Sequence, residues 1–219
     1  MNKVLITGAN RGIGLELSKQ LTARGDLVIA ACRKASDELR YLGVRVIDDV
    51  DVSSGESVGS LRDLLEGEPL DWLINNAGIL SVERLDGLDF QAMERQFKVN
   101  SLGPLRITAA LRANLAEGAK VGIVTSRMGS IEDNTSGGYY GYRMSKAAVN
   151  MAGMSLTRDL RDQGVAVALL HPGMVATDMT GGQGVPAEQS AAGLIQRMDE
   201  LDITTSGSFW HAQGERLPW

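Results

Sequence analysis

Cysteine is nearly absent from this 219-residue chain, since Cys32 is the only one. A single thiol excludes an internal disulfide and argues against a thiolate metal cluster. A run of basic residues is missing as well, and the formal net charge is −5. We therefore expect no nucleic-acid partner, because such partners are bound by clustered positive charge.

Long apolar runs are also missing. The apolar run near the N-terminus is too short for a signal peptide or a membrane span, and no later segment reaches about 18 uninterrupted apolar residues. Apolar residues make up 43 % and charged residues 22 %, an ordinary balance for a globular protein. We expect a cytoplasmic enzyme or binding protein without a membrane partner, with one domain over residues 1–219.

Short β-rich runs alternate with longer helical patterns along the whole chain. The expected strands are 3–7, 26–32, 43–50, 70–78, 119–126, 164–173 and 207–212. The expected helices are 11–24, 53–67, two helices over 89–115 with Pro104 beginning the second, 142–161 and 186–201. Near-continuous apolar strands separated by helices indicate a parallel sheet buried on both faces. The predicted fold is a doubly wound, Rossmann-type α/β sandwich with a mainly parallel sheet of about seven strands.

A glycine-rich turn, TGANRGIG, joins the first strand to the first helix. In a dinucleotide site Gly8 would permit the tight turn, Gly12 would let the backbone approach a pyrophosphate, and Gly14 would allow close helix packing. The spacing is G-x-x-x-G-x-G, and no Gly-Lys-Ser/Thr follows, which excludes a phosphate-binding P-loop. Taken alone, the motif also suits a turn that binds nothing.

The end of the second strand bears on cofactor choice. Sheets that bind NAD usually place Asp or Glu there for the ribose 2′-hydroxyl. This chain has Cys32, Arg33 and Lys34 instead, and Arg11 lies in the glycine turn. A guanidinium suits a 2′-phosphate, so we expect NADP(H) as the cofactor. The alternative is that Arg33 and Lys34 are only solvated surface residues.

Three of the four tyrosines crowd into four residues, as Tyr139, Tyr140 and Tyr142. In a helix beginning near Tyr142, Lys146 lies four residues on and therefore on the same face. A nearby ammonium lowers the pKa of a phenol, and a proton donor works best with its pKa near the working pH. Tyr142 is therefore the candidate acid, and the other two tyrosines are expected pocket walls.

Three motifs occur in order: TGANRGIG, NNAG at 75–78 and YRMSK at 142–146. Together with TSRMGS after the fifth strand and HPGMVATDM after the sixth, they resemble the short-chain dehydrogenase/reductase family in its single-domain branch. The resemblance spans essentially the whole chain. The short length and the ending FWHAQGERLPW look closest to bacterial carbonyl-reductase and C-factor-like members.

The resemblance implies a catalytic tetrad of Asn100, Ser126, Tyr142 and Lys146. Ser126 is chosen over Ser130 because x-x-Gly follows it, although the spacing to Tyr142 indicates a small insertion in the loop between them. Ser126 would bond the substrate oxygen, Tyr142 would protonate it, and Lys146 would tune Tyr142 and hold the nicotinamide ribose. Asn100 would hold a water that passes protons to Lys146; the alternative for Asn100 is a polar helix kink.

The resemblance also implies cofactor contacts at the carboxyl ends of the strands. These are Thr7, Gly8, Asn10, Arg11, Gly12, Ile13, Gly14, Arg33, Asp51, Val52, Asn76, Ala77, Gly78, Tyr142, Lys146, Pro172, Gly173, Val175 and Thr177. Residues 76–78 would line the adenine-ribose side, Asp51 and Val52 would contact adenine, and 172–177 would cradle the carboxamide.

No metal site is expected, because Asp48, Asp49 and Asp51 have no partnering histidine. His171 ends a strand and precedes a proline, which favours a structural histidine over a Ser-His-Asp triad.

The predicted function is an NADPH-dependent carbonyl reductase or alcohol dehydrogenase acting on a small carbonyl or secondary alcohol. The alternative is a cofactor-binding sensor or signalling protein of the same fold with little turnover. An epimerase of the longer family branch does not fit, since too little chain follows the sixth strand.

The glycine-rich segment 180–187 is expected to form an open or mobile lid. Tyr139, Tyr140, Met128 and Met174 are expected to line the substrate pocket. Family members often associate, so a homodimer or higher homo-oligomer is a further expectation.

Overall fold

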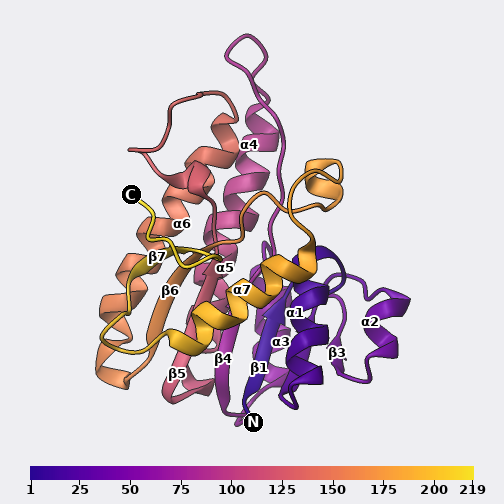
Figure 1. Ribbon diagram of the computed structural model, residues 1–219. Coiled ribbons are helices and arrows are strands. Elements are labelled where there is room, and N and C mark those ends of the chain that lie inside the picture. Colours follow the sequence, from indigo (N-terminus) through magenta and orange to yellow (C-terminus); the bar gives the residue numbers. More distant parts are fainter.

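Seven strands form one sheet in which all neighbouring strands are parallel (Figure 1). The computed structural model describes the whole chain, residues 1–219. The strands are β1 (Lys3–Thr7), β2 (Leu27–Ala31), β3 (Arg45–Ile47), β4 (Leu70–Asn75), β5 (Leu115–Val124), β6 (Ala166–His171) and β7 (Ser208–His211). Their order, β3-β2-β1-β4-β5-β6-β7, confirms the predicted doubly wound α/β fold.

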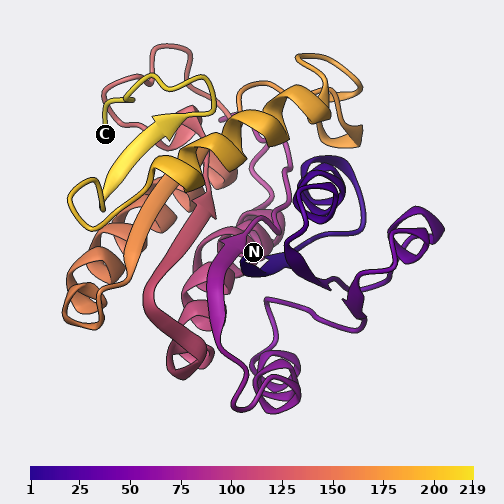
Figure 2. The same cartoon turned by 60° about the horizontal axis from the view of Figure 1, so that its bottom comes forward.

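Helices cover both faces of the sheet (Figure 2). They are α1 (Gly12–Ala23), α2 (Asp37–Tyr41), α3 (Gly55–Leu64), α4 (Phe90–Phe97), α5 (Gly103–Ala110), α6 (Tyr140–Asp159) and α7 (Ala187–Glu200). Leu5 packs in the core under α3, α5 and α6, whereas Val4 and Ile6 pack in the core under α1 and α7. Because both faces are covered, apolar residues follow one another along the strands without alternation.

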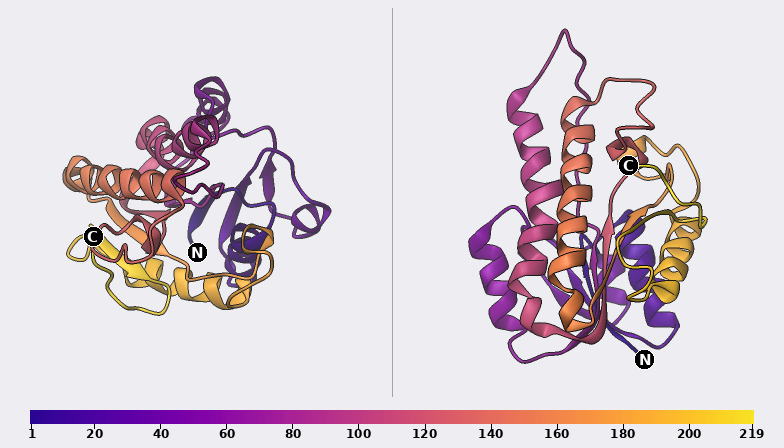
Figure 3. Two further views of the ribbon diagram at one scale, coloured as in Figure 1. Left: turned by 90° about the horizontal axis from the view of Figure 1, so that it is seen from above. Right: turned by 90° about the vertical axis from the view of Figure 1, so that its left-hand side faces the viewer.

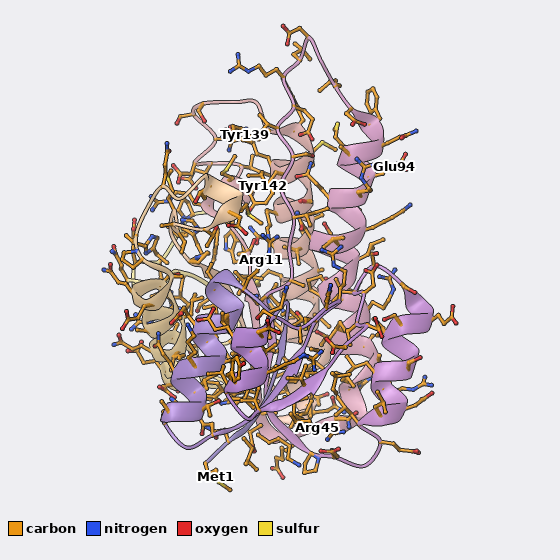
Figure 4. The ribbon with its side chains drawn as sticks, turned by 90° about the vertical axis from the view of Figure 1, so that its right-hand side faces the viewer. Met1, Arg11, Arg45, Glu94, Tyr139 and Tyr142 are labelled. Atoms are coloured by element: carbon orange, nitrogen blue, oxygen red, sulfur yellow. The ribbon has the colours of Figure 1, made fainter.

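The strand order reverses at β1. The chain runs outward from β1 through β2 to β3 and then returns to the other side of β1 as β4. In open α/β sheets, ligands bind at the carboxyl ends of the strands at such a reversal. The glycine turn after β1 and the NNAG segment after β4 both lie there. Figure 4 shows Arg11 and Tyr142 toward this end of the molecule, with Met1 and Arg45 at the opposite end.

The region predicted as two helices over 89–115 is one nearly continuous rod (Figure 3). A π-helical segment, η1 (Lys98–Leu102), joins α4 to α5, and Pro104 lies in the first turn of α5 as predicted. Wider π turns of this kind often occur at functional sites. Here the wider turn contains Asn100, which agrees with the interpretation of this residue as part of a helix irregularity.

Local differences from the predicted elements have short-range causes. Helix α2 was not predicted because its five residues are too few to show a period; Ser36 caps it by accepting a bond from the Leu39 amide (3.2 Å). Strand β3 is shorter than the predicted 43–50, since the backbone of Asp49 turns into the left-handed region (φ 60°).

We expect Gly14→Ala to lower the free energy of unfolding, because a Cβ there would lie 2.2 Å from the Gly8 carbonyl oxygen and 2.6 Å from Asn76 Nδ2. Overpacking of this kind costs roughly 1–3 kcal/mol. The matched control is Gly59→Ala in α3, where a Cβ would meet no atom within 4 Å; it should stabilise by about 0.5–1 kcal/mol. Urea denaturation of both variants measures the difference, and equal effects would contradict the packing argument.

Candidate functional site

A cavity of about 420 Å³ opens at the carboxyl ends of the central strands. Most of the predicted cofactor contacts line it, from the glycine turn, the ends of β2 and β4, helix α6 and the segment after β6. The predicted site residues that do not line it are Thr7, Gly14, Gly173, Val175, Asn100 and Ser126. Lining residues that the sequence reasoning missed are Cys32, Val50, Ile79, Val99, Val124, Thr125, Ala176, Asp178 and Met179. Several of these directly neighbour a predicted residue, so a wider window around each strand end would have found them.

The glycine turn and the NNAG segment touch at their backbones. Gly8 has φ +67°, and a Cβ there would lie 2.8 Å from the Ala77 Cα, so the position accepts only glycine. The side-chain amide of Asn76 donates to the backbone carbonyls of Thr7 and Gly8, at 3.1 Å each. Thr7 Oγ1 accepts from the amides of Asn76 (3.1 Å) and Ala77 (3.2 Å). Thr7 therefore shapes the cavity wall from behind instead of lining it.

The N-terminus of α1 is suited to an anion. Its capping residue, Arg11, makes no side-chain cap, and the first turn contains no acidic residue. The free amides and the helix dipole there favour a negative group such as a pyrophosphate. Since Gly12 and Ile13 of this turn line the cavity, the residues present fit a dinucleotide cofactor.

The corner at the end of β2 combines cations with a restrained carboxylate. Arg33 is exposed and lines the cavity, whereas Lys34 does not. Asp51 accepts bonds from the Ser53 amide (2.8 Å) and hydroxyl (2.7 Å). The Ser53 hydroxyl is the main reason that the pKa of Asp51 is below its usual value, and Arg33 adds to the effect. Arg11 pairs with Asp178 (2.5 Å) across the cavity mouth.

Tyr142 and Lys146 line the cavity from one face of α6, as predicted. The Lys146 ammonium donates to the Val124 carbonyl (2.9 Å) and lies 5.7 Å from the centre of the Tyr142 ring. Burial lowers the pKa of Lys146 to about 8. Burial also raises the pKa of Tyr142 to about 12, and a hydrogen bond with Ser126 partly opposes the rise. The pKa of Tyr142 is therefore raised where the sequence predicted a lower value, because burial of the phenol is the largest cause and Lys146 is not among the causes.

The two candidate serines differ in surroundings. Ser126 follows β5 and is 7 % exposed; its hydroxyl accepts from the Met128 amide (3.1 Å) and lowers the pKa of the Tyr142 phenol. Ser130 is buried as well, but its hydroxyl accepts from the Asp133 amide (3.0 Å) and so holds the following loop. Ser126, and not Ser130, is the serine that affects the pKa of the phenol.

Asn100 connects the NNAG loop to α6. Its side chain exchanges two hydrogen bonds with the backbone of Ile79, each 2.9 Å, and donates to Ser145 Oγ (3.0 Å). A Cβ on Gly78 would lie 3.4 Å from Asn100 Oδ1 and 3.8 Å from Lys146 Nζ. Asn100 thus borders the same small space as Lys146, although it does not line the main cavity.

Other residues considered from the sequence lie elsewhere. His171 packs edge to face with His211 (4.9 Å), and burial lowers the pKa of His171 to about 3. Tyr139, Tyr140 and Met128 do not line the cavity, and Met174 lines a separate one.

The expected lid is tied to the end of β6. The amide of Ala176 donates to the Val185 carbonyl (2.9 Å), and the Val185 amide donates to the Met174 carbonyl (2.8 Å). These bonds close the segment between them into a loop beside the cavity. No group of three or more His, Cys, Asp and Glu side chains is arranged to hold a metal ion, and none of the helices has both the length and the apolar character of a membrane span.

Comparison with known proteins gives a consistent picture. The family model described as short chain dehydrogenase matches residues 2–185. The 1-hydroxy-2-glutathionyl-2-methyl-3-butene dehydrogenase of Rhodococcus sp. (strain AD45) is 48 % identical over 226 residues and covers 100 % of both chains. The C-signal of Myxococcus xanthus is 48 % identical over 155 residues, which are 69 % of this chain and 93 % of that protein.

Solved structures agree with the sequence comparisons. The NADPH-bound carbonyl reductase from chicken fatty liver superposes with a TM-score of 0.89 at 29 % identity, covering 100 % of this chain and 99 % of that one. A carbonyl reductase from Pseudomonas aeruginosa PAO1 superposes with a TM-score of 0.89 at 31 % identity, covering 100 % of both chains. Because the family model covers most of the sequence and the Rhodococcus relative aligns from end to end, this chain belongs to the short-chain dehydrogenase family.

Proposed function

We propose that the protein is an NADPH-dependent oxidoreductase that reduces a small carbonyl compound, or oxidises the corresponding alcohol, with Tyr142 as general acid and base. The observation that carries the proposal is the meeting of Ser126, Tyr142 and Lys146 beside a cavity that fits a dinucleotide. We further propose that residues 1–219 act as one unit holding cofactor and substrate, since all strands belong to one sheet.

The cofactor, when bound, supplies or accepts the hydride. Negative charge then develops on the carbonyl oxygen, where the Ser126 hydroxyl and the Tyr142 phenol can donate hydrogen bonds. A pKa of about 12 keeps the phenol protonated and therefore able to donate. Lys146, with a pKa of about 8, is the group that exchanges protons near neutral pH, so it is suited to resupply the phenol. Arg33 and Arg11 would hold the 2′-phosphate, and the N-terminus of α1 the pyrophosphate.

Two relatives suggest how to test the substrate and the alternative function. The Rhodococcus relative is named for an alcohol that carries a glutathionyl group, so such alcohols belong in the substrate panel beside simple carbonyls. The likeness to C-signal favours a second candidate, a cofactor-binding signalling protein with little turnover. Cofactor binding without turnover of any compound in the panel would support this second candidate.

Removal of the Tyr142 hydroxyl tests the proposed acid. We expect Tyr142→Phe to lower kcat by about 10²–10⁴-fold, because a positioned proton donor is lost, while NADPH affinity stays close to that of the unmodified protein. Tyr140→Phe is the matched control, since Tyr140 lies in the same turn but outside the cavity. Steady-state kinetics with cofactor titration measure both variants. A fully active Tyr142→Phe protein would refute the assignment.

The two serines provide a second test. Ser126→Ala should lower kcat by about 10²-fold, the usual effect of losing a donor to a developing oxyanion. Ser130→Ala should leave kcat unchanged and cost about 1 kcal/mol of stability, because its hydroxyl only holds the loop. Parallel measurements of kcat and urea unfolding separate the two effects; the reverse pattern would mean that Ser130 serves the reaction.

Cofactor preference depends on Arg33. We expect the dissociation constant for NADPH to be roughly ten- to a hundredfold lower than for NADH, because a charge-assisted bond contributes about 1.5–3 kcal/mol before screening. Arg33→Ala should weaken NADPH binding far more than NADH binding, and added salt should narrow the gap. Lys34→Ala is the control, as Lys34 lies outside the cavity. Equal affinity for both cofactors in the unmodified protein would show that Arg33 and Arg11 only face water.

A further inference from the structure

Glu83 is a buried carboxylate that the proposed reaction does not use. It lies in the loop between β4 and α4 and is 1 % exposed. Its side chain accepts hydrogen bonds from Ser81 Oγ (2.5 Å), Gln96 Nε2 (2.9 Å) and the Gly141 amide (3.2 Å). All three donors are neutral groups. Burying a charge is costly unless hydrogen bonds or an opposite charge compensate for the lost water, so the position of the Glu83 carboxylate calls for an explanation.

The Gly141 bond places this carboxylate at the N-terminus of α6. Gly141 is the second residue of the helix and directly precedes Tyr142. The residue before the helix, Tyr139, has left-handed backbone geometry (φ 52°) and provides no side-chain cap. The first amides of a helix need acceptors, and a negative charge there is favoured by the helix dipole. Glu83 supplies both from a loop 58 residues away in the sequence. Its backbone carbonyl also accepts from the Tyr139 amide (2.9 Å).

Helix α4 fixes Glu83 in turn. Gln96 donates to the Glu83 carboxylate, while its own Oε1 accepts from the Ser81 amide (3.1 Å). A Cβ on Gly141 would lie 2.4 Å from Gln96 Nε2 and 2.8 Å from Met93 Cγ, so α4 and α6 are in tight contact at this level. Figure 3 shows the two helices side by side. The first turn of α6 therefore has little freedom to shift along or about its axis.

We propose that Glu83 is a positioning residue for Tyr142. By capping α6 one residue before the tyrosine, it fixes the height and rotation of the turn that brings the phenol to Ser126. The inference rests on the proposed function, in which Tyr142 donates the proton. Proton transfer requires close alignment, and a displacement of about 1 Å can cost 10²-fold in rate.

The test compares Glu83→Gln with the unmodified protein well below the melting temperature of either. Glutamine keeps the size of the side chain and one acceptor but removes the charge. We expect kcat to fall about 10- to 100-fold, with the KM for the carbonyl and the NADPH dissociation constant little changed. Hydrogen exchange measured by mass spectrometry should show faster exchange in the peptide covering 140–146. Ser81→Ala, which removes one donor and keeps the carboxylate, should show a smaller change of the same kind.

The matched control is Asn114→Ala. Asn114 is also a buried polar residue that links distant segments, since its Nδ2 donates to the carbonyls of Leu65 (2.6 Å) and Glu68 (2.9 Å), and it does not line the cavity. This variant should melt at a lower temperature yet keep kcat and the exchange rate of residues 140–146.

Two results would overturn the proposal for Glu83. The first is that Glu83→Gln changes neither kcat nor the exchange rate of residues 140–146. The second applies if Glu83→Gln does not fold, and it is that Ser81→Ala changes neither of these two quantities. If the unmodified protein turns over no carbonyl or alcohol, the proposed function fails by itself. Hydrogen exchange at 140–146 then tests only whether Glu83 holds the first turn of α6, and faster exchange in Glu83→Gln would support that structural role.

Discussion

The side-chain amide of Asn76 makes the contact on which the site depends. It donates to two successive carbonyls of the glycine turn, Thr7 and Gly8, at the point where the strand order reverses. The turn after β1 and the turn after β4 are thereby fixed against each other, and the space above them becomes a cavity. A glycine is required at position 8 because the Ala77 backbone occupies the room that a Cβ would need. The cavity is thus a consequence of close backbone approach.

Burial gives the two titrating groups of the site opposite tendencies. The same desolvation that raises the pKa of Tyr142 to about 12 lowers that of Lys146 to about 8, because each group is driven toward its neutral form. Burial thus holds the phenol toward the protonated form that donates, and it brings the pKa of the amine into the range where the amine responds to pH. Burying Lys146 in α6 lowers the stability of the protein. The close packing of α6 against α4 is one interaction that keeps the helix in place.

Much of the fold and of the cavity lining could be predicted from the sequence, because the patterns that indicate them lie within short segments. Continuous apolar strands predicted the sheet, and the family resemblance of the motifs at the strand ends implied most of the residues that line the cavity. The misses involve interactions between distant segments. Nothing near Glu83 indicates that it caps a helix 58 residues later, and nothing near Lys146 indicates that its ammonium bonds the Val124 carbonyl. The sign of the Tyr142 pKa shift depends on burial by the whole fold, which residue spacing does not report.

The pair of Arg11 and Asp178 shows how the cavity mouth can serve binding. Both side chains are largely exposed, at 63 % and 81 %. An exposed ion pair contributes about 0–1 kcal/mol, whereas a charge-assisted bond to a phosphate contributes about 1.5–3 kcal/mol. Under the proposed function, a phosphate that reached Arg11 would therefore replace Asp178 at a net gain. Asp178 belongs to the segment after β6, which the backbone bonds between Ala176, Val185 and Met174 tie to the end of β6 whether or not Arg11 is paired. The weakness of the pair would let Arg11 exchange Asp178 for the phosphate of the proposed cofactor.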